Sequence, residues 1–262
     1  MAKIKLVVSA TIEETFSDFI ISKKTKGLAE KTLQSYQAQF QAVARHLDVK
    51  MDIAMLQKAD LDAMIISMRT AHLSPNSINS YTRTLKSFFS WCNEQGITRL
   101  NIPLYKAEET VKETYSDLEL SALLKNPDIR KATFAEYRDW VIINFLLNYG
   151  SRAATVRAIQ IRDVDLDGGV VFYRHTKNRK TQVIPLCSAM VSILREHLRH
   201  RGGEAADFLF CTETGSQLTE NGLRQSIARY NTQRGVQKAS IHLFRHTIAR
   251  KYLIDCGGDK RA

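Results

Sequence analysis

Three short clusters contain residues whose types and spacing could bind and transfer a phosphoryl group. The first is Arg152, which follows Tyr149, Gly150 and Ser151 at the end of an apolar run. A guanidinium is planar and permanently charged, so it can offer two N–H donors to two phosphate oxygens. A surface arginine after a turn would have the same local sequence, so Arg152 by itself identifies no function.

The second cluster is the basic segment RHTKNRKT, residues 174–181. It separates GVVFY and QVIPL, whose composition is typical of strands, and this order predicts a β-hairpin with Lys177 in its turn. A lysine there could reach into a groove and donate a proton to a leaving oxygen. Arg174, Arg179 and Lys180 could contact a DNA backbone, although a solvated charged turn is the alternative interpretation.

The third cluster is IHLFRH, which contains His242 and Arg245. Positions i and i+3 share one face of a helix, so these two side chains could converge on one phosphate while Leu243 and Phe244 pack away from it. H-x-x-R alone is a weak signal. A metal site would need more histidine or carboxylate ligands than the segment offers, so we expect no metal and no cofactor.

The first hundred residues read as helices only. Thr11 and Glu14 have the spacing of a capping box, and apolar residues recur at helical spacing over 32–47 and 56–68. A fourth helix begins at Ser74-Pro75. Its aromatic residues follow the 3.6-residue period, so we expect them in the core rather than stacked on bases. Its polar side carries Arg83 and Lys86, which could meet a DNA backbone or water.

The remainder of the chain is mixed in character. Residues 101–114 lose the periodicity, and Ser116 with Glu119 forms a second capping box. An apolar helix is expected over 134–149, then two strands, then helices near 188–199, 219–230 and 240–254. The fold class is therefore mainly α with a small antiparallel β-sheet. We place an all-helical domain at 1–105, a linker at 106–115 and a mixed domain at 116–262.

The composition and net charge indicate which classes of partner the chain could bind. The net charge is +11, which suggests a polyanion such as nucleic acid, although ordinary solubility charge is the alternative. The chain lacks a nucleotide-binding glycine motif and an acidic cluster for a two-metal nuclease. It lacks a signal peptide and a long apolar run, so we expect no membrane partner and a cytoplasmic location. None of the cysteines lies in a C-x-x-C pair, so we expect reduced thiols. They are Cys92, Cys187, Cys211 and Cys256.

Read together and in order, these clusters resemble the tyrosine recombinase family of phage and transposon integrases. The string LLNYGSRAATVRAIQIRDVDLDGGVV resembles the family's stretch around its first arginine, and TKNRKTQVIPL resembles its β-hairpin. IHLFRHTIARKYLIDCGGD resembles its H-x-x-R helix. GLAEKTLQSY and LSPNSINSYTRTLKSFFSWC resemble its helical core-binding domain. The resemblance covers nearly the whole chain, and three ordered motifs are more specific than any one of them.

The resemblance implies a fold and a chemistry. A SAM-like core-binding domain and a catalytic domain would close around double-stranded DNA as a clamp, with a homo-oligomer possible on the DNA. Arg152 and Arg245 would hold the non-bridging oxygens of the scissile phosphate, and His242 would hydrogen-bond it. Lys177 would protonate the departing 5′-oxygen. A tyrosine would form a 3′-phosphotyrosyl link without metal or ATP, in site-specific recombination or integration of a mobile element.

The chain departs from the family pattern at two places. Thr155 stands where the family usually has an acidic residue, which puts the support of Arg152 in question. Ala262 comes before the family's second His or Trp and its tyrosine, and we expect the one tyrosine after Arg245, Tyr252, to lie in the core. The expectation is an integrase whose nucleophile segment is missing, inactive alone and weakened in assembly. The alternative is a non-catalytic, regulatory DNA-binding protein derived from an integrase. An unrelated helical regulator is disfavoured by the hairpin lysine and H-x-x-R.

Overall fold

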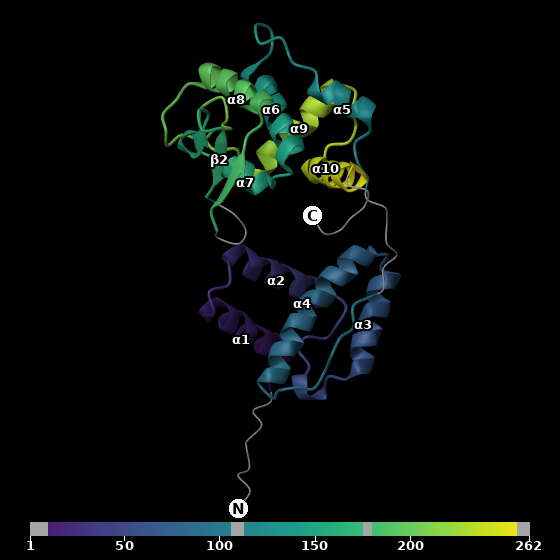
Figure 1. Ribbon diagram of the computed structural model, residues 1–262. Coiled ribbons are helices and arrows are strands. Elements are labelled where there is room, and N and C mark those ends of the chain that lie inside the picture. Colours follow the sequence, from purple (N-terminus) through teal and green to yellow (C-terminus); the bar gives the residue numbers. More distant parts are fainter. Residues whose placement is uncertain (1–9, 106–112, 175–179, 256–262) are drawn as a thin grey trace, which may run out of the picture. The chain divides into compact units, whose positions relative to one another are not determined.

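The computed structural model describes residues 10–105, 113–174 and 180–255. The chain divides into two compact units, Met1–Thr110 and Val111–Ala262, each with its own hydrophobic core (Figure 1). The described residues are mainly helical with one small sheet, as the sequence predicts. None of the described helices is long and apolar enough to cross a membrane.

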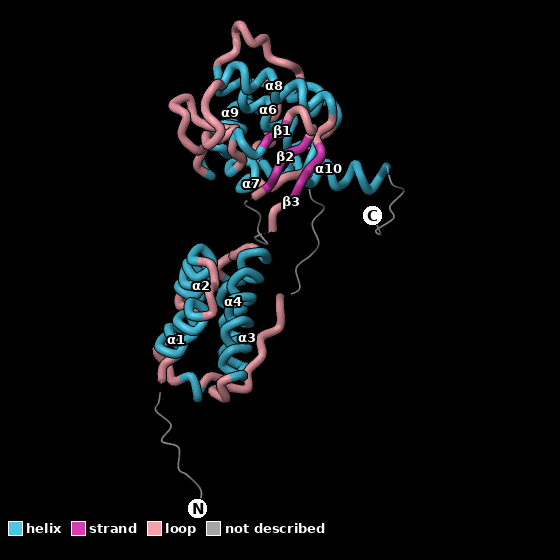
Figure 2. Tube along the Cα trace, turned by 60° about the vertical axis from the view of Figure 1, so that its left-hand side comes forward, coloured by secondary structure: helices cyan, strands magenta, loops and turns pink. Residues whose placement is uncertain are grey.

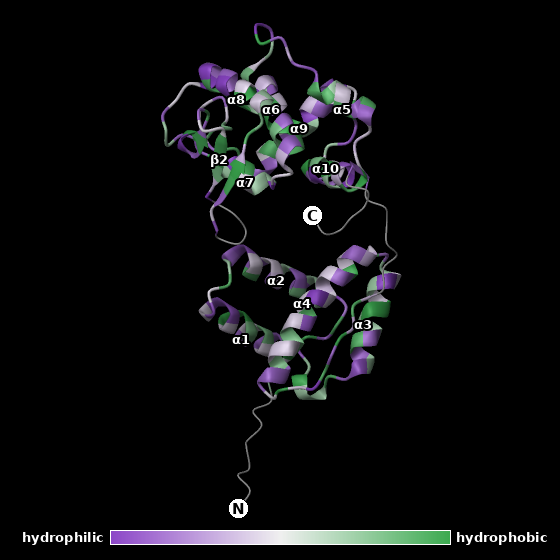
Figure 3. Ribbon diagram, in the orientation of Figure 1, coloured by the Kyte–Doolittle hydropathy of each residue, from purple (hydrophilic) through white to green (hydrophobic). Residues whose placement is uncertain are grey.

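The first unit is all-helical and begins at a capping box. Thr11 accepts from the Glu14 amide, and the Glu14 carboxylate accepts from the Thr11 amide at 2.8 Å. Phe16 stacks on Phe40 at 3.8 Å, and Phe88 packs edge-on against Phe16. Figure 3 shows α4 with hydrophobic and hydrophilic positions on different sides, as one buried face requires. The elements are α1 (Ile12–Thr25), α2 (Glu30–Val43), η1 (Ile53–Met55), α3 (Lys58–Thr70) and α4 (Pro75–Glu94).

The second unit surrounds a buried helix and includes a three-stranded antiparallel sheet in the order β1-β2-β3 (Figure 2). Val171 in the central strand pairs with Val164 on one side and Ile184 on the other. The elements are α5 (Asp117–Leu124), α6 (Phe134–Tyr149), α7 (Ala153–Ala158), η2 (Ile161–Asp163), β1 (Val164–Asp165), β2 (Val170–Tyr173), β3 (Gln182–Pro185), α8 (Ser188–Arg201), α9 (Glu220–Gln233) and α10 (Ile241–Asp255).

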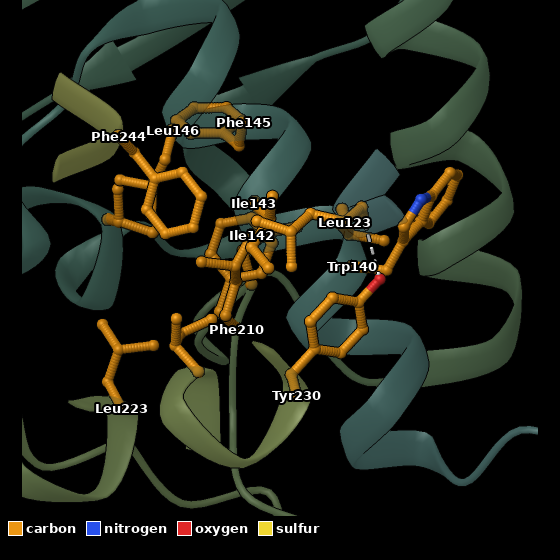
Figure 4. Close-up of a cluster of buried hydrophobic side chains, with 14 of the residues drawn as sticks. Leu123, Trp140, Ile142, Ile143, Phe145, Leu146, Phe210, Leu223, Tyr230 and Phe244 are labelled. Atoms are coloured by element: carbon orange, nitrogen blue, oxygen red, sulfur yellow. Dashed lines mark hydrogen bonds between the residues drawn. The ribbon is translucent and has the colours of Figure 1, made fainter. Parts of the chain in front are cut away.

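Helix α6 is apolar on nearly every side because other helices surround it. It contacts α5, α8, α9 and α10, and its residues from Tyr137 to Ile143 are all buried. The close-up shows side chains from α5, α6, α9 and α10 gathered in one cluster (Figure 4). Within it, the Tyr230 hydroxyl donates to the Leu123 carbonyl at 2.9 Å. This packing fixes the position of α10 against the centre of the unit.

A charged pair lies inside this core with its donors satisfied. Arg138 donates to Asp139 at 2.7 Å, to the Cys211 carbonyl at 2.9 Å and to Ser226 at 2.7 Å. Ser226 in turn donates to Asp139. A buried ion pair is tolerated when its remaining polar atoms are also bonded, and here the bonds tie α6 to α9.

The expectation that Tyr252 lies in the core is wrong. Tyr252 is 49% exposed, and the neighbouring Leu253 and Ile254 are exposed as well. The physical reason is that the C-terminal turns of α10 extend beyond the other helices of the unit, so little packs against their apolar side (Figure 2). Helical periodicity shows which side of a helix is apolar, but not how far along its length that side is covered.

Candidate functional site

The turn between α6 and α7 places Arg152 at the surface. Gly150 ends α6 in the left-handed conformation, with φ of 57°, a conformation that glycine adopts without steric cost. The next residue, Ser151, is buried and shares a 2.5 Å hydrogen bond with the Tyr173 hydroxyl of β2. Arg152 is then exposed at the N-cap of α7. The turn is therefore anchored on the sheet while its arginine faces solvent.

The second arginine reaches the same turn from α10. His242 and Arg245 are exposed one turn apart, while Phe244 between them is fully buried. Nη1 of Arg245 donates to the Gly150 carbonyl oxygen at 2.9 Å. Because that carbonyl lies two residues before Arg152, the structure brings the segments that carry the two arginines into direct contact.

His242 lies at the edge of an open hollow beside this turn. The hollow has a volume of about 750 Å³, and Ala153, which follows Arg152, lines it together with His242. Its other wall is the polar face of α9. The α9 residues are Glu220, Asn221, Arg224, Gln225 and Ala228. The hollow therefore lies between the start of α7, the first turn of α10 and α9, and its remaining lining residues, Ala239, Ser240 and Ile241, lead into α10.

Two of the basic residues predicted for the hairpin, Lys177 and Arg179, lie outside the described residues. The two strands that flank their segment are antiparallel neighbours, as the sequence predicts. Arg174 is held by Asp163, whose carboxylate accepts from Nε at 2.6 Å. Asp163 is buried while the Arg174 side chain is 51% exposed, so Arg174 is part of a structural ion pair and still presents donors to solvent. Lys180 is exposed.

The remaining sequence-predicted contacts belong to the first unit. Arg83 and Lys86 are both exposed on α4, one turn apart, with the buried Leu85 between them. They share one polar face, and α4 also carries buried Phe88 and Phe89 on its core side. The interpretation of these aromatic rings as core is confirmed, so stacking on bases is not their role.

Burial raises the pKa of two tyrosines near the arginines. Desolvation raises the pKa of Tyr149 and that of Tyr173 to about 12. Both hydroxyls therefore stay protonated at neutral pH and serve as hydrogen-bonding groups. Among the described residues, no group of three histidine, cysteine, aspartate or glutamate side chains is placed to hold a metal ion.

Sequence reasoning missed the groups that support the arginines. Ser151 and Tyr173 are 22 residues apart, and Asp163 is 11 residues from Arg174. No local pattern marks such pairs. The Thr155 position, which the sequence leaves without an acid, is buried in the same group of residues as Asp163 and Arg174. A buried carboxylate is thus present near Thr155, but from a different element.

The chain thus combines an all-helical unit with a helical unit that holds a small sheet and brings Arg245 to the turn of Arg152. Residues 115–261 match the phage integrase family, and residues 15–96 match the N-terminal SAM-like domain of phage integrases. The first match alone covers more than half of the chain. The chain therefore belongs to the phage integrase family.

Two curated relatives give the range of similarity. The chain is 24% identical over 212 residues to a tyrosine recombinase XerC of Xanthomonas campestris pv. campestris (strain B100), covering 80% of this chain and 65% of that relative. It is 23% identical over 263 residues to a tyrosine recombinase XerD of Listeria monocytogenes serovar 1/2a, covering 95% and 86%. The chain therefore spans less than two thirds of the XerC relative.

Solved structures show the same fold. A lambda integrase dimer bound to a COC′ core site matches with a TM-score of 0.75 at 16% identity, covering 94% of this chain and 91% of that chain. The Tn1549 transposon integrase in complex with transposon right end DNA matches with a TM-score of 0.77 at 17% identity, covering 95% and 88%. At these identities the likeness establishes the fold.

Proposed function

We propose that this chain binds duplex DNA and carries the phosphate-binding part of a site-specific DNA recombination site. The observation that carries the proposal is the bond from Arg245 to the Gly150 carbonyl, which brings the second arginine to the turn of Arg152. His242 lines the hollow beside that turn. Two permanent cations brought to one turn, with an imidazole on the same helix face as Arg245, suit a DNA phosphate, because each guanidinium can donate to its oxygens.

The roles follow from the reaction class of the family. Arg152 and Arg245 hold the non-bridging oxygens while negative charge builds on them in the transition state. A tyrosine hydroxyl attacks phosphorus, a 3′-phosphotyrosyl bond forms, and the bond to the 5′-oxygen breaks. The tyrosine proton passes to a base, for which His242 is the candidate, and Lys177 protonates the departing 5′-oxygen. We assign the nucleophile to none of the described tyrosines.

The two units have different parts in this proposal. Residues 1–105 act as the core-binding domain, residues 106–115 as linker and residues 116–262 as the catalytic-type domain. Arg83 and Lys86 on α4 and Arg174, Arg179 and Lys180 at the hairpin contact the DNA backbone. Proteins of the same fold solved on DNA include a lambda integrase dimer on a core site and a lambda integrase tetramer on a Holliday junction, which supports a homo-oligomer on DNA. Such a protein acts on DNA in the cytoplasm.

A salt titration tests the proposal. The chain is titrated onto a short fluorescein-labelled duplex, and anisotropy gives the dissociation constant at several salt concentrations. The log–log slope falls by about 0.9 for each phosphate that the protein no longer neutralises. Arg245→Ala is expected to flatten the slope by about this amount and to weaken binding by about tenfold or more.

The matched control is Arg130→Ala. Arg130 has an 88% exposed side chain in the second unit and pairs with Asp128 at 3.5 Å, so its loss removes the same charge away from the α6–α7 turn. We expect its slope to equal that of the parent chain. Equal slopes for the Arg245 and Arg130 variants would show that Arg245 holds no phosphate, and the proposed site would be wrong.

A further inference from the structure

We infer that Tyr115 is a positioning residue that sets the orientation of α10 and, through it, of His242 and Arg245. The inference rests on the proposed function, since it concerns how the proposed phosphate ligands are held. Tyr115 is buried at the start of the second unit, where the chain arrives from the first. Its contacts with α10 are to Phe244 and Thr247, the two buried residues of that helix.

Tyr115 meets α10 with both its ring and its backbone. The ring stacks on that of Phe244, with centroids 4.6 Å apart and planes at 29°. The Tyr115 amide donates to Oγ1 of Thr247 at 3.0 Å, and that hydroxyl donates to the Leu243 carbonyl at 2.8 Å. Stacking fixes the lateral position of the helix, and the hydrogen bond fixes its position along its own axis.

The Tyr115 hydroxyl fixes the other end of the same ring. It donates to the Lys238 carbonyl at 3.3 Å and accepts from Nδ2 of Asn231 at 3.0 Å. Nζ of Lys238 then bonds the Thr114 carbonyl and the Glu119 carboxylate, both at 3.0 Å. Tyr115 therefore joins the end of α9, the segment that leads into α10, and α10 itself.

Two further bonds lie toward the C-terminal end of α10. Arg250 donates to Oγ1 of Thr114 at 3.0 Å, and Lys251 pairs with Asp117 at 2.7 Å. Both are exposed and add little energy individually. They extend the contact of residues 114–117 along two turns of the helix, with Tyr115 as its buried centre.

Helix geometry translates this contact into the position of the site. Successive residues are turned by about 100°, so Phe244 lies about 100° from Arg245 and about 160° from His242. A side-chain head roughly 6 Å from the axis moves by about 1 Å when the helix turns by about 10°. A displacement of that size is enough to cost a well-placed catalytic contact about a hundredfold. The ring that packs on Phe244 therefore controls where both site residues point.

The experiment compares substitutions at Tyr115 with a matched buried tyrosine in the full chain. Tyr115→Leu removes the ring stack and the hydroxyl, and Tyr115→Phe keeps the stack. Tyr137→Leu is the control, since Tyr137 is a buried tyrosine of α6 that packs on Trp140 and bonds Glu196 of α8. Each variant is titrated onto the same fluorescein-labelled duplex over a range of salt, alone and combined with Arg245→Ala.

We expect Tyr115→Leu to lower the salt slope by about 0.9 and to weaken binding by about tenfold, as Arg245→Ala does. The double variant should bind no more weakly than either single one, because both substitutions remove the same phosphate interaction. Tyr115→Phe should keep the parent slope. Tyr137→Leu should lower the melting temperature without changing the slope. If Tyr115 had a purely structural role, Tyr115→Leu would give this same result.

Two results would overturn the inference and leave the proposed function standing. One is a double variant whose loss of binding is the sum of the two single losses. The other is a parent-like salt slope in Tyr115→Leu together with a lowered slope in Arg245→Ala. An unchanged slope in Arg245→Ala would overturn both. If Tyr115→Leu does not fold, Phe244→Leu replaces it, since it removes the other ring of the stack and keeps the hydrogen bonds of Tyr115. A parent-like slope in Phe244→Leu would then overturn the inference.

Discussion

Acid should destabilise the second unit through His197, a fully buried histidine of α8. Burial lowers its pKa from 6.5 to about 4, and the charges of Arg201, Arg138 and His200 act in the same direction, against the bond to the Leu209 carbonyl. The imidazole packs against Phe134, Tyr137 and Phe210, with Nε2 3.0 Å from that carbonyl oxygen. The folded state therefore holds this side chain neutral.

The direction and size of the effect follow from the two pKa values. Above pH 6.5 the imidazole is neutral in both states, and the stability is fully present. As the pH falls below 6.5, the unfolded chain binds a proton that the folded chain does not bind until about pH 4. Each pH unit in that window costs about 1.4 kcal/mol, so the free energy of unfolding drops by about 3 kcal/mol across it.

Urea unfolding of the parent chain and of His197→Phe between pH 7 and pH 4 measures this loss. Phenylalanine suits the aromatic surroundings but leaves the Leu209 carbonyl without its partner, which costs about 1–3 kcal/mol at pH 7. Because phenylalanine does not titrate, the gap between the two stability curves should close as the pH falls and then reverse. Curves that stay parallel down to pH 4 would refute the reasoning, since other titrating groups contribute equally to both proteins.

Three further predictions concern the α6–α7 turn and its surroundings. Gly150→Ala and Gly235→Ala should each lower the melting temperature by about 2–4 °C, because each places alanine in a left-handed conformation at a cost of about 1 kcal/mol. A Cβ at position 150 would lie 4.0 Å from Cγ of Arg245, which is an ordinary contact. A much larger loss for Gly150→Ala in calorimetry would therefore contradict this prediction. Asp163→Asn should lower the free energy of unfolding in urea by about 1–2 kcal/mol, because Arg174 loses its charged partner. The loss is modest because the Arg174 side chain is half exposed to solvent. Unchanged stability would count against a role for that ion pair. Tyr252 should form no SDS-stable adduct on a nicked duplex, since it follows Arg245 by about 10 Å of helix; an adduct that disappears in Tyr252→Phe would show the opposite.

Local signals in the sequence located most of the helix starts. Thr11 with Glu14, and Ser116 with Glu119, form capping boxes in the structure as predicted. Ser74 caps α4 with a proline in its first turn. The apolar run over 134–149 is a helix with the predicted bounds. These features depend on residues three or four apart, and the sequence displays such neighbours directly.

Contacts between distant residues could not be read in the same way. The bond from Arg245 to the Gly150 carbonyl joins positions 95 apart, and the contact of Tyr115 with Thr247 joins positions 132 apart. The sequence indicated that His242 and Arg245 share a helix face, but not which turn that face meets. Tyr252 shows the converse error, because its helical period was correct and its burial was not.

The hydrogen-bond partner of Arg245 is a backbone oxygen, and this affects which amino acids position 150 can hold. Every amino acid carries a carbonyl, so no substitution at position 150 deletes the acceptor itself. Only the left-handed backbone restricts what stands there, and asparagine also visits that conformation. Related chains can therefore diverge widely around this turn and keep the arginine in place, so identity at position 150 is a poor guide to whether the site is intact.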